Sequence, residues 1–336
     1  MKQVFITGST GLLGNNLVRM LVKKGIKVKA LARSKKKAEK QFDGLDIEII
    51  EGDVKNISAF KSSLRGCDTL FHTAAFFRDN YKGGNHWNEL YEINVEGTKN
   101  LLEASYDAGI RRAVHTSSIA VLDGPRGALI DETMTRSTEN ADGYYRSKIL
   151  ADQQVHEFLK LHPDMFVTIV LPGWMFGPGD IGPTSSGQFI IDFLTGRLPG
   201  IVPGSFSVVD ARDVATIQIL AAQYGRRGER YLAAGRHMTM SNILPLLAEV
   251  SGIKPPTKKI PFKLLKVIAF ISELHGRITG KPVLLSKSTV KLMIQEENRT
   301  YFNHQKTFTE LQSSFRPIKE TLESVILWYR KNGYIE

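Results

Sequence analysis

The chain of 336 residues contains a single cysteine, Cys67. One thiol excludes a disulfide within the chain and provides no cysteine set for a metal, so we expect a reducing compartment and no metal site. No apolar run approaches the length of a membrane span, and the sequence from Met1 shows no secretory signal. These absences favour a cytoplasmic protein without an integral membrane segment.

The net charge of +11 is concentrated in two segments. Residues 23–40 and 254–291 each carry nine lysines and arginines against one glutamate, Glu39 and Glu273 respectively. Neither segment contains a recognisable nucleic-acid-binding motif, so no nucleic-acid partner is expected. We expect the second segment to be a solvated face, with an acidic-substrate rim or a membrane-surface contact as alternatives. Its amphipathic stretch 262–274 is expected to cover the core rather than to lie on a membrane.

An apolar run at residues 4–6 leads directly into a glycine-rich turn. This pattern predicts a strand, a turn and a helix start, whose free N–H groups bind phosphate while the glycines let a pyrophosphate approach the backbone. The spacing Gly-x-x-Gly-x-x-Gly differs from the more familiar G-x-G-x-x-G, and an ordinary tight turn is the alternative. We expect a dinucleotide here, held by Gly8, Thr10, Gly11, Leu12, Leu13 and Gly14.

Arg33 follows the second predicted strand, residues 26–32. An NAD site usually carries an acidic residue near this point, which binds the ribose 2′-hydroxyl. A guanidinium instead binds a 2′-phosphate, which an acid would repel. We therefore favour NADP(H), with NAD(H) as the second choice and a basic surface loop as the alternative explanation of Arg33.

Further strands are predicted at residues 46–50, 69–73 and 113–118, alternating with helices. This alternation predicts an α/β fold built on a doubly wound parallel sheet. Asp53, after the first of these strands, either binds an adenine amino group or caps the next helix. Small residues after the second strand permit close approach of a ligand. The small residues at that strand end are Thr73, Ala74 and Ala75.

Tyr144 and Lys148 lie four residues apart in a segment predicted to be helical from about residue 141. Residues at this spacing share a helix face, and an ammonium beside a phenol lowers the pKa of the phenol. Such a tyrosine exchanges protons near neutral pH, and Ser118, at a strand end, supplies a hydroxyl to the same substrate oxygen. An ordinary amphipathic helix carries the same pair of residue types, so the pair alone is weak evidence.

Four motifs occur together and in order. They are Gly8-x-x-Gly11-x-x-Gly14, Asn94-Val95-Glu96-Gly97-Thr98, Thr116-Ser117-Ser118 and Tyr144-x-x-x-Lys148. This set resembles the extended short-chain dehydrogenase/reductase family, part of the NAD-dependent epimerase/dehydratase superfamily, and residues 171–180 and 209–215 resemble later segments of that family. Arg33 and residues 71–75 are most similar to the dihydroflavonol-4-reductase-like members.

The resemblance implies a Rossmann domain at residues 1–177, to which the chain returns near 205–235. A smaller, mostly helical substrate lobe would comprise 178–204 and 236–336, and a homodimer is compatible with the family. Further residues are implied to bind the cofactor. These are Val54, Asn94, Tyr144, Lys148, Pro172 and Gly173.

The sequence thus predicts an NADPH-dependent reductase of an aldehyde or ketone, reversible as an alcohol dehydrogenase. Tyr144 would be the general acid, assisted by Ser118 and Lys148. Candidates for the substrate pocket are Phe76, Phe77, Ser118 and Trp174. The alternative is an NAD-dependent epimerase or dehydratase of a sugar nucleotide, which Leu171 disfavours because many epimerases carry arginine there. A dinucleotide-binding regulator without turnover is a further alternative.

Overall fold

Seven parallel strands form the central sheet, in the order β3-β2-β1-β4-β5-β6-β9. The computed structural model describes residues 1–77, 85–139, 141–279 and 286–335. The strands are β1 (Gln3–Thr7), β2 (Lys27–Ala32), β3 (Glu48–Glu51), β4 (Thr69–His72), β5 (Arg112–Thr116), β6 (Phe166–Pro172) and β9 (Arg230–Ala233). The predicted α/β fold with a parallel sheet is confirmed.

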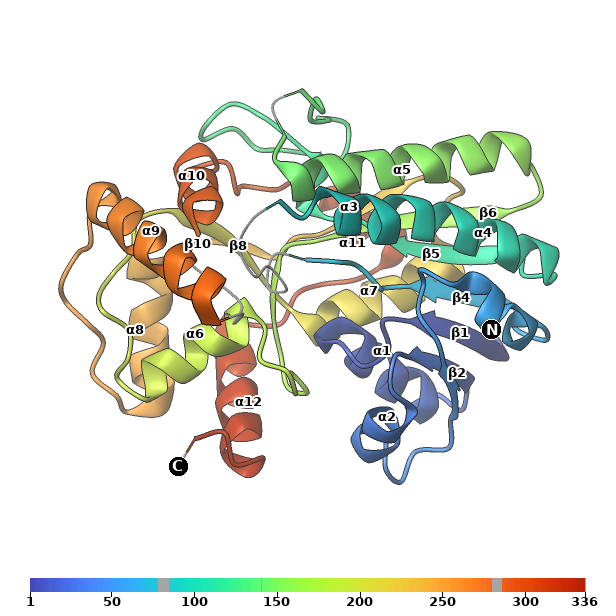
Figure 1. Ribbon diagram of the computed structural model, residues 1–336, viewed down its shortest axis with the longest axis horizontal. Coiled ribbons are helices and arrows are strands. Elements are labelled where there is room, and N and C mark those ends of the chain that lie inside the picture. The colour runs from blue at the N-terminus through green and yellow to red at the C-terminus, as the bar shows by residue number, and fades with distance from the viewer. Residues whose placement is uncertain (78–84, 140, 280–285, 336) are drawn as a thin grey trace.

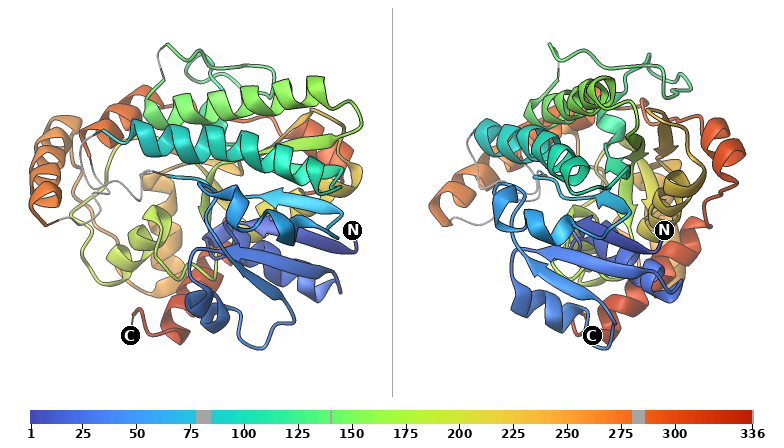
Figure 2. Two further views of the ribbon diagram at one scale, coloured as in Figure 1. Left: turned by 45° about the vertical axis from the view of Figure 1, so that its right-hand side comes forward. Right: turned by 90° about the vertical axis from the view of Figure 1, so that its right-hand side faces the viewer.

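Helices cover both faces of this sheet (Figures 1 and 2). One face is packed by α1 (Leu12–Lys23) and α7 (Ala211–Tyr224), and α2 (Lys35–Gln41) lies on the same side. The other face is packed by α4 (Gly97–Asp107) and α5 (Gly143–Leu161). Short elements fill the connections. They are η1 (Ile57–Ala59), η2 (Lys61–Leu64), α3 (Trp87–Leu90), the π-helical turn η4 (Tyr91–Glu96) and η5 (Ile119–Val121).

The alternation of side chains along β1 explains the two layers. Val4 and Ile6 are buried in the core that includes Leu17 of α1, whereas Phe5 is buried in the opposite core with Leu101 of α4. Successive residues of a strand point to opposite faces of a sheet, so an uninterrupted apolar strand requires cover on both sides. The apolar residues 4–6 therefore place β1 at the centre of the fold.

A smaller lobe lies beside the sheet and contains a second, three-stranded sheet in the order β10-β8-β7. Its strands are β7 (Trp174–Phe176), β8 (Ser205–Asp210) and β10 (Arg236–Thr239). The helices of this lobe are α6 (Ser185–Leu194), α8 (Met240–Ser251), α9 (Phe262–Thr279), α10 (Lys287–Gln295) and α12 (Ile318–Lys331). The remaining helix of the C-terminal part, α11 (Gln305–Leu311), instead packs against α7 and β9 of the large sheet. Side chains of α6, α8 and α12 form its apolar core with Phe176 and Val208.

The segment 205–235, where we expect the chain to return to the large sheet, is divided between the two parts. Strand β8 pairs in the smaller sheet, whereas α7 packs on the large sheet and β9 joins its edge beside β6. Only the later part of this segment therefore belongs structurally to the large sheet. The domain bounds at residues 177, 204 and 235 remain a prediction.

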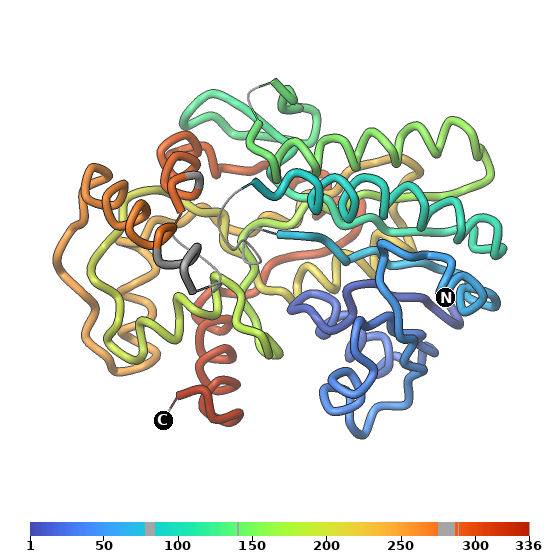
Figure 3. The backbone as a smooth tube through the Cα atoms, viewed as in Figure 1, coloured from blue at the N-terminus to red at the C-terminus, as the bar shows by residue number. Residues whose placement is uncertain are grey.

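The chain path places the carboxyl ends of the parallel strands toward the smaller lobe. Figure 3 shows the N-terminus at the far end of the sheet and the C-terminus below the smaller lobe. In an open α/β sheet, ligands bind in the crevice at the carboxyl ends of the strands. We therefore expect the predicted site residues to lie at this edge of the sheet.

Candidate active site

The glycine turn after β1 packs tightly against the end of β4. Gly8 adopts φ +66°, and a Cβ atom there would lie 2.6 Å from the Ala74 nitrogen. A Cβ atom on Gly14 would lie 2.2 Å from the Gly8 carbonyl oxygen. Neither contact is compatible with a side chain, so both positions require glycine.

Helix α1 begins directly after this turn without a side-chain cap. Gly11 is its N-cap residue, and the first turn carries no acidic residue. The N–H groups of Leu12, Leu13 and Gly14 precede the first intrahelical bond, which Asn15 donates to the Gly11 carbonyl. An uncapped helix N-terminus with a close glycine turn fits the pyrophosphate of a dinucleotide. Thr10 lies within this turn, and its carbonyl accepts a bond from Gln41.

The ends of β2 and β3 carry the next two predicted cofactor residues. Arg33 is exposed immediately after β2. Asp53, after β3, accepts the N–H of Lys55 at 3.0 Å in a turn, whereas Asn56 occupies the N-cap position of η1 without a side-chain hydrogen bond. Asp53 thus does not cap the following helix, the alternative that its sequence position suggested. Val54 is buried in the core.

The small residues after β4 are held by the end of β1. The Thr73 hydroxyl donates to the Thr7 carbonyl at 2.7 Å, and the Ala74 N–H donates to the Thr7 hydroxyl at 3.3 Å. Ala74 is half-buried and Ala75 is exposed. These bonds fix the backbone beside the glycine turn, where the cofactor is predicted.

Tyr144 lies in the first turn of α5, which Asp142 caps by accepting the Tyr145 N–H at 2.9 Å. The Tyr144 side chain is only 8% exposed and packs with Leu90 and Ala120. The edge of its ring meets the ring of Phe77, with centroids 4.8 Å apart. The structure therefore brings the predicted general acid and a predicted pocket residue together. Residues 78–84 of the expected substrate loop lie outside the described residues.

Ser118 lies two residues beyond the end of β5, at the N-cap of η5. Its hydroxyl oxygen accepts the Ala120 N–H at 3.2 Å. A hydroxyl that accepts one bond retains its own proton for donation. Ser118 can thus donate a hydrogen bond to a substrate oxygen while the cap holds its position.

Lys148 follows Tyr144 by one helical turn and is buried. Its ammonium donates to the Thr116 carbonyl, at the end of β5, at 2.7 Å. Burial lowers the pKa of Lys148 to about 8, and the nearby Asp152 carboxylate opposes this effect. Lys148 thus remains mostly protonated at neutral pH but loses its proton under mildly alkaline conditions.

A buried ionic group behind Lys148 was not predicted. Asp152 on α5 lies 3.5 Å from His115 of β5 and 3.3 Å from Arg230 of β9. Burial raises the pKa of Asp152, but these two partners outweigh it and hold the pKa below its usual value. Burial lowers the pKa of His115. The spacing of four residues places Asp152 one helical turn beyond Lys148, but no pattern in the sequence indicates its contacts with His115 and Arg230.

Asn94 holds the pocket wall in place. Its side-chain oxygen accepts the Phe76 N–H at 2.7 Å, and its amide nitrogen donates to the Phe76 carbonyl at 3.0 Å. The same nitrogen donates to the Ser147 hydroxyl on α5 at 2.9 Å. Asn94 therefore links η4, the segment after β4 and the helix that carries Tyr144. The role of Ser147 was also not predicted.

The segment after β6 packs between the two sheets. Pro172 ends β6, and a Cβ atom on Gly173 would lie 2.3 Å from the Ala234 carbonyl oxygen. Trp174 packs in an aromatic cluster, with ring centroids 4.7 Å from Phe176 and 5.0 Å from Phe206. Close packing is thus one sufficient reason for glycine at position 173.

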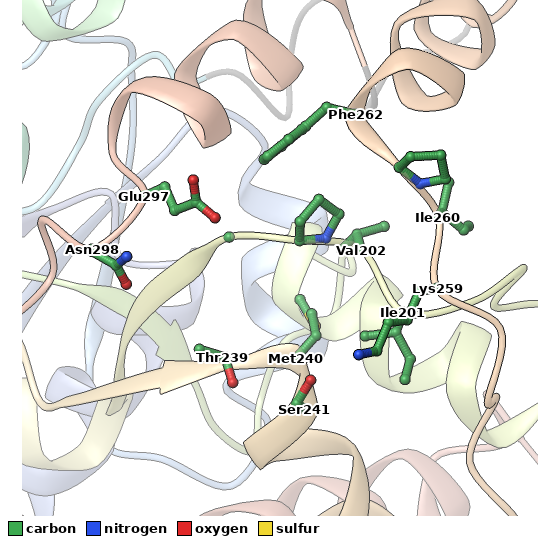
Figure 4. Close-up of a pocket in the computed structure, with 13 residues that line it drawn as sticks. Ile201, Val202, Thr239, Met240, Ser241, Lys259, Ile260, Phe262, Glu297 and Asn298 are labelled. Carbon is green, nitrogen blue, oxygen red and sulfur yellow. The ribbon is translucent and has the colours of Figure 1, made fainter.

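A cavity of about 540 Å³ lies within the smaller lobe (Figure 4). Phe262 lies on one side of it, and Thr239 and Met240 lie on the opposite side. None of its lining residues is among the predicted site residues. The cavity is therefore distinct from the cluster around Tyr144. In the described part of the chain, no group of three or more His, Cys, Asp or Glu side chains is arranged to hold a metal.

Comparison with known proteins gives matches over most of the chain. A family model described as the NAD dependent epimerase/dehydratase family matches residues 4–234. The chain is 39% identical over 269 residues to sterol demethylase protein B of Methylococcus capsulatus, covering 80% of each chain. It is 32% identical over 345 residues to a provisionally named dihydroflavonol 4-reductase of Synechocystis, covering 99% of this chain and 96% of the relative. The crystal structure of gox2253 is similar throughout both chains, with a TM-score of 0.83 and 28% identity.

Proposed function

Because the chain belongs to the NAD-dependent epimerase/dehydratase family, we propose that it is an NADPH-dependent reductase of an aldehyde or ketone, reversible as an alcohol dehydrogenase. The observation that carries this proposal is the arrangement around the end of β5. Tyr144 is buried against Phe77, and Lys148 is bound to the Thr116 carbonyl, two residues before Ser118. These groups supply a proton donor, a nearby positive charge and a hydroxyl at one edge of the sheet.

The chemistry of reduction divides between the cofactor and the protein. The nicotinamide, when bound, supplies the hydride. Tyr144 donates a proton to the carbonyl oxygen, and Ser118 donates a hydrogen bond that positions this oxygen. The positive charge of Lys148 would favour proton exchange at the Tyr144 phenol, and its ammonium would bind the ribose hydroxyls of the cofactor. Asn94 keeps the backbone around Phe76 in place.

The cofactor would lie along the carboxyl ends of the strands. The uncapped start of α1 would bind its pyrophosphate, and Arg33 would bind the 2′-phosphate that distinguishes NADPH from NADH. Asp53 would accept a bond from the adenine amino group. The exposed guanidinium at this position, with no acid in its place, supports NADPH.

Substitution of Tyr144 by phenylalanine tests the proposal. NADPH oxidation is followed with a panel of aldehydes and ketones that includes dihydroflavonols and ketones of the sterol class, because the relatives' names contain the words dihydroflavonol and sterol. Loss of the general acid should lower the turnover rate by about 10²- to 10⁴-fold while NADPH still binds. Tyr145→Phe is the matched control because the Tyr145 ring packs against both Tyr144 and the Arg136 guanidinium. It removes the same hydroxyl group from the neighbouring tyrosine and keeps the ring, so this variant should retain its rate.

Full turnover by a Tyr144→Phe variant that binds NADPH would contradict the mechanism. An epimerase or dehydratase would use the same tyrosine and lysine but would regenerate its cofactor in each cycle. Conversion of a sugar nucleotide without net NADPH consumption would therefore favour that alternative.

A further inference from the structure

Helix α9 presents a continuous apolar face to solvent. Leu264, Val267, Ile271 and Leu274 recur at positions i, i+3, i+7 and i+10, and Phe270 lies beside them. Each of these five side chains is between 42% and 59% exposed. Residues at this spacing form one stripe along a helix. Figures 1 and 2 show α9 at the outside of the smaller lobe, beside α10.

The opposite face of α9 holds the helix on the protein. Leu265 and Ala269 are buried in a small core with Ile260 and Val290 of α10. The expectation that the amphipathic stretch 262–274 covers the core is therefore correct for this face only. The exposed apolar stripe corrects that expectation, because covering the core does not account for it.

The segment that carries the stripe, residues 254–291, is strongly basic. Glu273 is the only acidic residue among residues 254–291. Its carboxylate accepts the backbone N–H of Lys287 at 2.7 Å. Seven lysines of this segment are exposed. They are Lys254, Lys258, Lys259, Lys263, Lys266, Lys287 and Lys291. None of the seven forms an ion pair with any residue that the structure describes, so no carboxylate among these residues neutralises them. The Lys287 ammonium lies 4.3 Å from the centre of the Phe270 ring, beside the stripe.

We propose that the apolar stripe of α9 and the exposed lysines of residues 254–291 bind the surface of an anionic lipid bilayer. An amphipathic helix with a basic polar face lies in the membrane interface, with its apolar side chains at the acyl boundary. Lysines extend their charged ends toward the headgroups while their aliphatic stems remain with the apolar face. Among the described residues, no helix is long and apolar enough to cross a membrane. The proposed contact is thus a surface contact of α9.

The charge argues against a second copy of the chain as the occupant. Two stripes meeting face to face would bring together two segments that each carry a large net positive charge, and like charges repel. An anionic surface instead attracts the lysines of this segment, and each basic residue near it strengthens binding. Charge complementarity therefore favours the lipid surface.

Vesicle co-sedimentation tests the proposal with the full-length protein. The vesicles contain phosphatidylcholine alone or phosphatidylcholine mixed with phosphatidylglycerol. The unmodified protein should bind the anionic vesicles, and binding should weaken as salt concentration rises. The double substitution Val267→Ser/Ile271→Ser should lower the partition coefficient by about tenfold or more, because two apolar side chains are removed from the interface. Lys263→Gln/Lys266→Gln should weaken anionic binding and leave binding to phosphatidylcholine unchanged.

The matched control replaces two exposed leucines outside α9. Leu161 ends α5 and Leu327 lies on α12, and both are more exposed than any side chain of the stripe. Leu161→Ser/Leu327→Ser should bind vesicles as the unmodified protein does. Failure of the unmodified protein to bind anionic vesicles, or equal loss in this control, would overturn the proposal. So would a dimer, seen by sedimentation velocity, that Val267→Ser/Ile271→Ser abolishes in a protein that does not bind lipid.

Discussion

Lys148 shows how burial at the edge of the sheet changes the pKa of a single charged group. Its ammonium is buried, donates to the Thr116 carbonyl and lies close to the Asp152 carboxylate. Burial lowers the pKa of Lys148 to about 8, and Asp152 counteracts part of this shift. The charge that assists Tyr144 is therefore present at neutral pH and is lost just above it.

This position of the Lys148 pKa predicts the pH dependence of carbonyl reduction. Below about pH 8 Lys148 is protonated and favours proton transfer from Tyr144, and above it the positive charge disappears. The rate of reduction should therefore fall as the pH rises through about 8. A pH–rate profile under saturating NADPH measures this directly.

Asp152→Asn provides the internal comparison for this profile. Removal of the carboxylate removes a group that raises the Lys148 pKa, so the alkaline limb should move to lower pH. Asp164→Asn is the control, because Asp164 lies on the surface with Arg111. An alkaline limb unchanged in Asp152→Asn would contradict the account of this charge.

At the residue scale the sequence predicted the groups whose spacing is local. Tyr144 and Lys148 are recognisable because one helical turn separates them. The contacts of Asp152 with His115 and Arg230 join three elements distant in the sequence, and no local pattern encodes which strands become neighbours. For the same reason the link from Asn94 to Ser147 could not be predicted.

The glycine turn is the element on which cofactor binding most depends. Its two constrained glycines are fixed by backbone contacts with Ala74 and within the turn itself. The sequence predicted a strand, a turn and a helix here because the apolar run, the glycines and the helical periodicity all agree. It could not show that the turn is braced by the end of β4, which lies more than sixty residues later.

Gly14→Ala should destabilise this element. The added Cβ atom would lie 2.2 Å from the Gly8 carbonyl oxygen, so the turn must shift. We expect a loss of about 1–3 kcal/mol in the free energy of unfolding, together with weaker dinucleotide binding. Chemical denaturation and cofactor titration measure the two effects.

Gly182→Ala is the matched control for that substitution. A Cβ atom there would meet no heavy atom within 4 Å, and its φ lies outside the positive range. The free energy of unfolding of the Gly182→Ala variant should change by about 0.5 kcal/mol or less. Equal stability and equal cofactor affinity of Gly14→Ala and Gly182→Ala would contradict the role assigned to the turn.

Helix α9 shows that the hydrophobic periodicity of a helix does not specify which of its faces is buried. The amphipathic pattern predicted a helix over residues 262–274, and the structure has one. Apolar residues occur on more than one face, and only the packing of Leu265 and Ala269 decides which face is buried. Exposure of the remaining stripe follows from three-dimensional packing rather than from the pattern.

At the scale of the whole molecule, the parallel sheet brings residues from five strand ends to one edge. The glycine turn, Arg33, Asp53 and the residues after β4 and β5 follow strands that are neighbours in the sheet. Alternating strands and helices made this arrangement predictable. The division of residues 205–235 between two sheets was not predictable, because a short apolar strand fits either sheet equally well.

The central claim is that this edge binds NADPH in preference to NADH through Arg33. Calorimetric titration of the cofactor-stripped protein with each dinucleotide, repeated with Arg33→Ala, tests it most directly. The account predicts tighter binding of NADPH, by about tenfold or more, and loss of this preference in Arg33→Ala because the charge-assisted bonds to the 2′-phosphate disappear. Preference for NADH, or an NAD molecule that cannot be removed, would contradict the account and favour the epimerase or dehydratase alternative.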